Sequence, residues 1–203
     1  MDKAKIRLSQ KESELVANAD WILTKNGILQ KAKYILEYLQ GQQQQFFSSH
    51  PAAVPAEVMA ISPKISKGEN YKGLPYLVLD FPRFFDREDH FAVRCMFWWG
   101  NFFSITLHLS GIYKTKYENK MEASFMFLKE EGFFISVGED QWEHHFETTN
   151  YRQLNKMNQD EFRKHLAGRN FIKLAKRFPL EQWEDAGDIL LASFCKMINW
   201  LGS

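Results

Sequence analysis

Residues able to bind a ligand alternate with apolar residues along two neighbouring segments, 90–98 and 102–110. The dipeptide Gly100-Asn101 separates them, and both residue types tolerate the positive φ of a tight reversal, so the pattern predicts a β-hairpin. A two-residue loop would place polar side chains beside apolar ones on the same face. We expect the three-residue loop, which separates them and sets Trp98 opposite Phe102 or Trp99 opposite Phe103.

With that register, one face of the hairpin is wholly apolar, and the other carries a guanidinium, two imidazoles and three hydroxyls among apolar side chains. An ordinary solvated strand face would carry Lys and Glu instead. Apolar walls around a few convergent polar groups are typical of small-molecule pockets. We therefore predict that this face binds a ligand through Arg94, Thr106, His108, His90, Trp98 and Phe102.

The predicted ligand is a small anionic or partly aromatic molecule, or a protein partner. Arg94 would attract an anionic group, His108 and Thr106 would make directional hydrogen bonds, and the Trp98 and Phe102 rings would stack on an apolar part. The simpler alternative is a sheet face half covered by a loop, with Arg94 paired to a carboxylate of residues 86–90.

An enzyme on the same face is a second hypothesis, with His108 as general base and Arg94 stabilising negative charge as it develops. The sequence contains no nucleophile elbow, metal motif or paired-carboxylate pattern that would assign a reaction. Catalytic residues therefore stay unassigned. Binding ranks above catalysis for this reason.

Histidines and carboxylates crowd together only in residues 140–147, DQWEHHFE. If this segment is a strand, its adjacent histidines point to opposite sides, whereas zinc needs three or more converging ligands. We expect no metal site and no cofactor.

A third hypothesis is nucleic-acid binding through residues 152–177. Between 151 and 178 the chain has eight Lys and Arg against two Asp and Glu, with phenylalanines interleaved. Such interleaving suits contacts to phosphates and bases. No nucleic-acid-binding signature accompanies it, so a solvated surface is the favoured interpretation.

Composition indicates a soluble globular chain. It has 203 residues, 45% hydrophobic and 25% charged, with a net charge of +1 that favours neither nucleic acid nor membrane. The N-terminus lacks the apolar region of a secretory signal, and we expect a cytoplasmic protein that folds alone or as a symmetric homodimer. Cys95 and Cys195 are expected to be buried free thiols.

The element pattern predicts one α+β domain over residues 1–203. We expect an antiparallel sheet of four to six strands around the central hairpin (about 90–113), packed by an N-terminal helical hairpin and a C-terminal helix that Pro179 opens. The expected parts are a helical hairpin over 1–40 with its turn at Asn26-Gly27, a loop-rich connection over 41–75, the sheet over 76–147, and a helical part over 148–203.

Two segments are less clear. Residues 115–131 fit a helix by the spacing of their large apolar residues, but the second half also fits a strand, which we favour. Residues 76–81 predict a short strand that ends at Pro82, because proline cannot donate to a sheet ladder.

Overall fold

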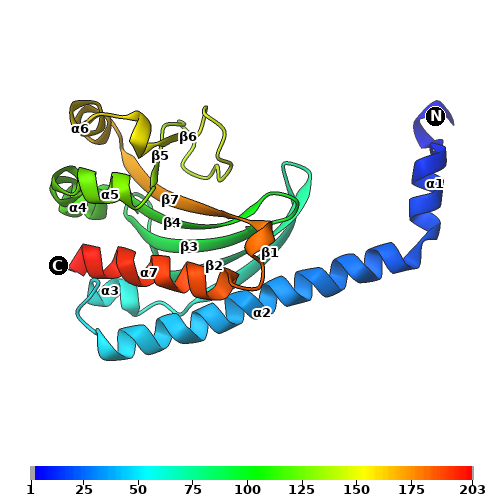
Figure 1. The fold of residues 1–203 in the computed structure, drawn as a ribbon, viewed down its shortest axis with the longest axis horizontal. Coiled ribbons are helices and arrows are strands. Elements are labelled where there is room, and N and C mark those ends of the chain that lie inside the picture. Colours follow the sequence, from blue (N-terminus) through cyan, green and yellow to red (C-terminus); the bar gives the residue numbers. More distant parts are fainter. Residues whose placement is uncertain (1–2, 203) are drawn as a thin grey trace.

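The computed structural model describes residues 3–202 of the chain, and its centre is one curved antiparallel sheet (Figure 1). Helices cover one face, which we call the inner face, and the α+β class is confirmed. The sheet has seven strands rather than four to six, in the order β1-β2-β3-β4-β7-β5-β6. The strands are β1 Lys64–Tyr71, β2 Leu74–Phe85, β3 His90–Trp98, β4 Phe102–Ser110, β5 Phe134–Ser136, β6 Tyr151–Gln153 and β7 Phe171–Pro179.

Helices α2, α3 and α7 lie below the sheet in Figure 1, with α2 and α7 side by side, and α4, α5 and α6 lie at its left end. The α-helices are α1 Gln10–Ala17, α2 Ala19–Ser49, α3 Ala56–Met59, α4 Gly111–Ala123, α5 Phe125–Glu130, α6 Gln159–Ala167 and α7 Ala186–Gly202, and the 3-10 helices are η1 Lys3–Ile6, η2 Leu154–Lys156 and η3 Leu180–Gln182. None of the helices in residues 3–202 has the length and apolar character needed to cross a bilayer.

The register of the central hairpin is confirmed. Trp98 lies opposite Phe102 and Arg94 opposite Thr106, so the loop between β3 and β4 has the expected odd length, and Gly100 takes a φ of 68°. On the inner face this register gathers side chains that are all at most 1% exposed: Phe91, Val93, Cys95, Phe97, Phe103, Ile105, Leu107 and Leu109.

The C-terminal helix covers this apolar row, as expected, but it begins at Ala186 and not at Pro179, which is the last residue of β7. The Trp183 ring, just before α7, lies 5.5 Å from the ring of Phe97 and 5.4 Å from that of Phe103. Within α7, Phe194 packs edge-on against Phe46 and Phe47 of α2. Helices from both ends of the chain therefore close the same core.

The predicted N-terminal helical hairpin is wrong. Helix α2 passes through Asn26 and Gly27 without a break and continues through the glutamine run to Ser49. A glycine inside a helix costs only about 1 kcal/mol, and burying Leu29 and Leu36 against the sheet outweighs that cost. The loop-rich connection expected over 41–75 is accordingly replaced by the end of α2, by α3 and by edge strand β1.

Residues 115–131 are helical, so the strand expected in their second half is also wrong. Helices α4 and α5 bury Tyr117, Met121, Phe125 and Leu128, whose spacing of three or four residues is that of a helix face. Gly132 has a φ of 76° and lies just after α5 ends, so it marks the end of this helix and not a turn between two strands.

Strand β2 does not end at Pro82 but runs on to Phe85. Its register with β3 shifts between Asp80 and Arg83, where β2 has one residue more than β3. A bulge of this kind tolerates proline, because the ladder hydrogen bond is already interrupted there.

The C-terminal part is also less helical than expected, because β7 lies between β4 and β5 inside the sheet. Residues 172–175 are buried on both faces. Their sequence therefore lacks the alternation that marks a half-exposed strand.

Candidate functional site

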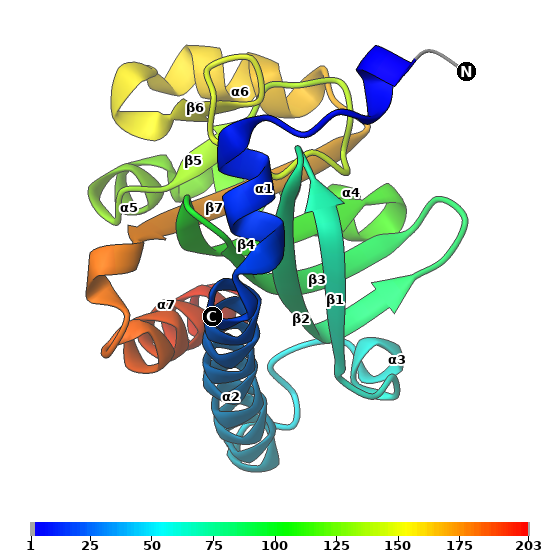
Figure 2. The ribbon, with the colours of Figure 1, turned by 90° about the vertical axis from the view of Figure 1, so that its right-hand side faces the viewer.

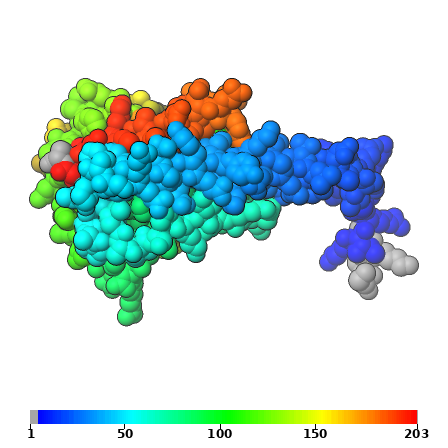
Figure 3. Space-filling view, turned by 90° about the horizontal axis from the view of Figure 1, so that it is seen from below, coloured from blue at the N-terminus to red at the C-terminus, as the bar shows by residue number. Residues whose placement is uncertain are grey.

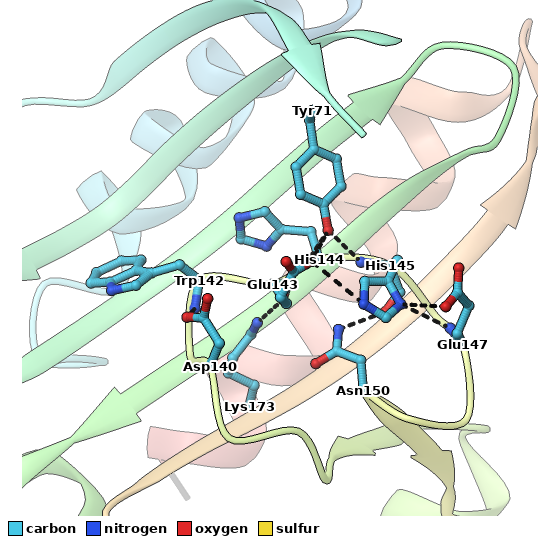
Figure 4. Close-up of polar contacts among 9 residues, drawn as sticks. All are labelled: Tyr71, Asp140, Trp142, Glu143, His144, His145, Glu147, Asn150 and Lys173. Carbon is cyan, nitrogen blue, oxygen red and sulfur yellow. Dashed lines mark hydrogen bonds and ion pairs between the residues drawn. The ribbon is translucent and has the colours of Figure 1, made fainter. Parts of the chain in front are cut away.

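The outer face of the sheet is covered by one irregular segment, residues 137–150, which we call the covering loop (Figure 4). All six predicted site residues lie on this face, as the hairpin register requires. Five of them are buried, and Arg94 is partly exposed. The buried five are His90, Trp98, Phe102, Thr106 and His108.

The structure divides these six residues into two groups. Trp98 and Phe102, with ring centroids 5.4 Å apart, belong to an apolar cluster that includes Met96 and packs against Phe146 of the covering loop. Arg94, Thr106, His108 and His90 form the polar group further along β3 and β4. Trp98 and Phe102 therefore pack against the covering loop. They do not border the side on which the polar group is exposed to solvent.

Tyr71, at the end of β1, fixes the covering loop from one side (Figure 4). Its hydroxyl oxygen accepts hydrogen bonds from the backbone amides of His144 (2.7 Å) and His145 (3.0 Å) and donates to the Glu143 carboxylate (2.7 Å). Burial, and then Glu143, raise the pKa of this hydroxyl. Tyr71 therefore stays protonated and keeps donating to Glu143 at ordinary pH.

Arg94 forms an ion pair with Asp80, its direct neighbour on β2, and not with a carboxylate of residues 86–90. The contact is bidentate, with Nε to Oδ1 at 2.7 Å and Nη2 to Oδ2 at 2.8 Å. Nη1 donates to His144 Nε2 at 2.9 Å. This bond requires a neutral imidazole, because only the unprotonated ring nitrogen can accept.

Gln141 of the covering loop bridges two histidines of the sheet. Its side-chain oxygen lies 3.0 Å from His108 Nε2 and 3.3 Å from His90 Nδ1. The Trp142 ring lies beside both imidazoles, with ring centroids 5.6 Å and 5.5 Å away. The polar group is thus closed by a side-chain amide and an indole.

Lys173 of β7 also lies among the polar residues between the sheet and the covering loop, which we call the layer, and the sequence did not identify it as a site residue. It lies opposite His108 in the sheet register and is 1% exposed. Its Nζ donates to the backbone oxygen of Glu143 (Figure 4). The same Nζ lies 5.4 Å from the centroid of the Tyr151 ring. Burial, and then the nearby charge of Arg94, lower its pKa to about 7. A sequence signal existed, since Lys173 stands within an otherwise apolar run of β7.

The two histidines that face the layer are held neutral. Burial, followed by the charge of Lys173, lowers the pKa of His108 to about 3. The same causes lower the pKa of His144 well below its ordinary value, with a further contribution from Arg94. The covering loop therefore rests on a layer in which added protons would meet existing positive charge.

A groove of about 820 Å³ opens at the margin of the covering loop, between it and the outer face of β1 to β3. The Arg94–Asp80 pair belongs to its lining, together with four aromatic side chains. The aromatic lining comprises Tyr71, Tyr76, Phe85 and Trp142, and the cationic lining comprises Lys64, Arg83, Arg87 and Arg94 against Asp80 and Asp86.

The basic residues of 152–177 do not form one surface. Arg152 pairs with Glu161, Arg169 with Glu139, and Lys176 with Glu131. Arg163 pairs with Asp160, and the guanidinium of Arg177 lies over the rings of Phe134 and Phe146. Four of the eight Lys and Arg side chains counted in the sequence are thus paired with carboxylates.

Within residues 3–202, no three His, Cys, Asp or Glu side chains are grouped so that they could hold a metal ion. The crowded histidines and carboxylates of 140–147 lie in the covering loop and not on a strand. There His145 contacts Glu143 (3.4 Å) and Glu147 (3.7 Å), while His144 turns to Arg94.

Comparisons of this chain with models of protein families, with curated proteins and with solved structures found no match.

Proposed function

We propose that this protein binds a small anionic ligand that carries an aromatic part, in the groove at the margin of the covering loop. The observation that supports this proposal is the lining itself, in which four aromatic side chains and four cations converge with only two carboxylates. Aromatic walls offer stacking and cations offer charge-assisted hydrogen bonds, so the two parts of such a ligand would each find a partner.

Within the groove, the cations do not contribute equally. Asp80 neutralises Arg94, so we assign the anchoring of an anionic group to Lys64 and Arg87, whose side chains have no ion pair in the described structure, and to Arg83. Arg83 donates from Nε to the backbone oxygen of Ser62 (2.9 Å), which leaves its terminal nitrogens for a ligand. Arg94 would then form the floor of the site.

The remaining predicted residues have a supporting role in this proposal. His90 lines the groove directly, whereas Thr106 and His108 lie under the covering loop and hold the layer beneath it. Trp98 and Phe102 anchor Phe146 of the loop. Trp142, missed in the sequence, replaces them as the ring on which an aromatic ligand would stack.

Binding is better supported than catalysis by His108. A general base works best when its pKa is near the working pH, and the pKa of His108 is about 3. Its Nε2 is also occupied by Gln141. Nucleic-acid binding through residues 152–177 has less support still, because most of that region's cations are paired or stacked.

The test uses 1-naphthyl phosphate as the probe, with inorganic phosphate and 1-naphthol as its separate halves. Amide chemical-shift mapping should move resonances of residues 64–87 and 141–144, and the intact probe should bind more tightly than either half. Trp142→Ala and Arg87→Gln should each weaken binding about tenfold, equivalent to about 1.4 kcal/mol.

The matched control is Arg163→Gln, a surface arginine outside the groove, which should leave binding unchanged. Shifts confined to another part of the molecule, or no shifts at millimolar probe, would overturn the proposal.

A further inference from the structure

The N-terminal arm, residues 6–24, projects away from the sheet (Figures 1 and 3), so the turned view of Figure 2 looks along α2 with α1 in front. Its apolar side chains are exposed to solvent. Helix α1 buries none of its residues, and the buried residues of α2 begin only at Leu29. The exposed apolar residues of the arm are 41% to 76% exposed: Ile6, Leu8, Leu15, Val16, Trp21, Ile22 and Leu23.

The arm is built as an ordered unit although it touches little. Ser9 and Glu12 form a capping box at the start of α1. At the bend, the amide of Asn18 donates to the Leu15 backbone oxygen (3.2 Å), and its side-chain oxygen accepts from the Trp21 amide (3.2 Å). Lys25 then ties the base of the arm to Glu69 of β1 at 2.9 Å. Such capping specifies both helix ends and the bend between them.

Apolar side chains cover more than half of the circumference at the start of α2. Trp21, Ile22 and Leu23 are consecutive, so they point in three directions about the helix axis. Ile22 also continues the stripe that Leu29 and Leu36 bury in the core, seven residues apart at each step. An apolar surface this wide on a helix is normally covered by other elements, and nothing in the described part of this chain covers this one.

We propose that the arm is covered by the arm of a second copy of this chain, in a symmetric dimer. The exposed area fits this partner. Taking roughly 200 Å² for a fully exposed large apolar residue, the seven side chains offer about 800 Å², which is about what each partner contributes to a standard interface.

The sequence around the bend is also self-complementary. Leu15 and Ile22 stand at equal distances on either side of the bend, and so do Val16 and Trp21. If α1 of one copy lies antiparallel to the start of α2 of the other, each pair meets across the interface. A two-fold axis that bisects the bend produces both such contacts at once, which is the property of an isologous interface.

The first experiment measures mass in solution by light scattering at 1–100 µM chain. The wild-type protein should have twice the 23.9 kDa chain mass, and Leu15→Glu with Ile22→Glu should be monomeric. The control is Ile112→Glu with Met126→Glu, two comparably exposed apolar residues of α4 and α5, which should remain dimeric.

Far-ultraviolet circular dichroism checks that each variant is folded. A wild-type monomer at 100 µM, as expected if the arm serves a different protein, would overturn the proposal, and so would a dimer that survives the arm substitutions.

The second experiment tests the antiparallel arrangement in a Cys195→Ser background. Ala17 and Asp20 form another pair at equal distances from the bend. Mixing Ala17→Cys chains with tagged Asp20→Cys chains under mild oxidation should yield a disulfide-linked heterodimer. Tyr34→Cys chains, altered at an exposed site further along α2, should not be linked to Asp20→Cys. The absence of the first product, or equal amounts of both, would exclude this arrangement.

Discussion

On the inner face of the sheet, α2 and α7 contribute rings and aliphatic chains that pack against other apolar groups, as Phe194 does against Phe46 and Phe47. On the outer face, the covering loop reaches the sheet mainly through hydrogen bonds to Tyr71, Arg94 and Lys173. Apolar packing does not depend on protonation, whereas the contact between Arg94 and His144 requires a neutral imidazole. The two faces should therefore respond differently to the same perturbation.

The largest effect should come from the inner face. Phe194→Ala removes a fully buried ring from the contact between α2 and α7 and should lower the free energy of unfolding by about 3–5 kcal/mol. A urea titration at pH 7 measures it, and the loss should be similar at pH 5. Exposed Phe127→Ala is the control, and a loss below about 1 kcal/mol at position 194 would show that this face is not core.

Lowering the pH should destabilise the protein through the outer face. The folded-state pKa of His108, about 3, lies below its unfolded value near 6.5, so the unfolded chain binds more protons in this interval. Stability is therefore fully present above pH 6.5 and is lost as pH falls toward 3. His144 contributes in the same direction.

The loss for His108 should reach roughly 2–3 kcal/mol by pH 4, measured by urea titrations across this interval. His108→Gln should flatten the dependence, whereas Phe194→Ala should shift the whole curve without changing its shape. If His108→Gln left the slope unaltered, the pH sensitivity would have to arise elsewhere. Lys173 acts at higher pH, because its pKa of about 7 lies below its ordinary 10.5, so it costs stability as pH falls from 10.5 to 7.

The smallest effect should be local. Tyr71→Phe removes the hydroxyl that accepts from two loop amides and donates to Glu143, at a cost of about 1–2 kcal/mol. Amide hydrogen exchange should accelerate at residues 143–146 and stay unchanged in α7. Tyr34→Phe, on the exposed side of α2, is the control. Equal acceleration on both faces would mean that the loop does not open independently.

The parts of the fold that could be predicted are those that local pattern determines. Strict alternation on both sides of Gly100 specified the hairpin register, and the apolar stripe that includes Phe194 specified α7. Asn26-Gly27 was misread as a helix end. A glycine inside a helix costs little free energy compared with what α2 gains by burying its later residues against the core. Strand β7 was not predicted, because a strand that is buried on both faces does not show the alternation of polar and apolar residues.

The site could be predicted only in part for a related reason. Sharing one face of a hairpin is a local property, so the six residues were correctly placed on one face, although Trp98 and Phe102 lie apart from the polar group. What closes the site is not local, because Tyr71 and Lys173 meet the covering loop from strands at opposite sides of β3 and β4. The partner of Arg94 was also missed, since Asp80 lies in a neighbouring strand whose register the sequence left open.

The extra residue in β2 between Asp80 and Arg83 exchanges the faces to which odd- and even-numbered side chains point. Before it, even-numbered side chains such as Val78 and Asp80 face the groove, and after it the odd-numbered Arg83 and Phe85 do, while Phe84 turns inward to the Tyr113 ring. Deleting one residue there would exchange these orientations, sending a guanidinium toward the helices and a phenyl ring toward solvent. A single unpaired position thus decides which chemistry the groove presents.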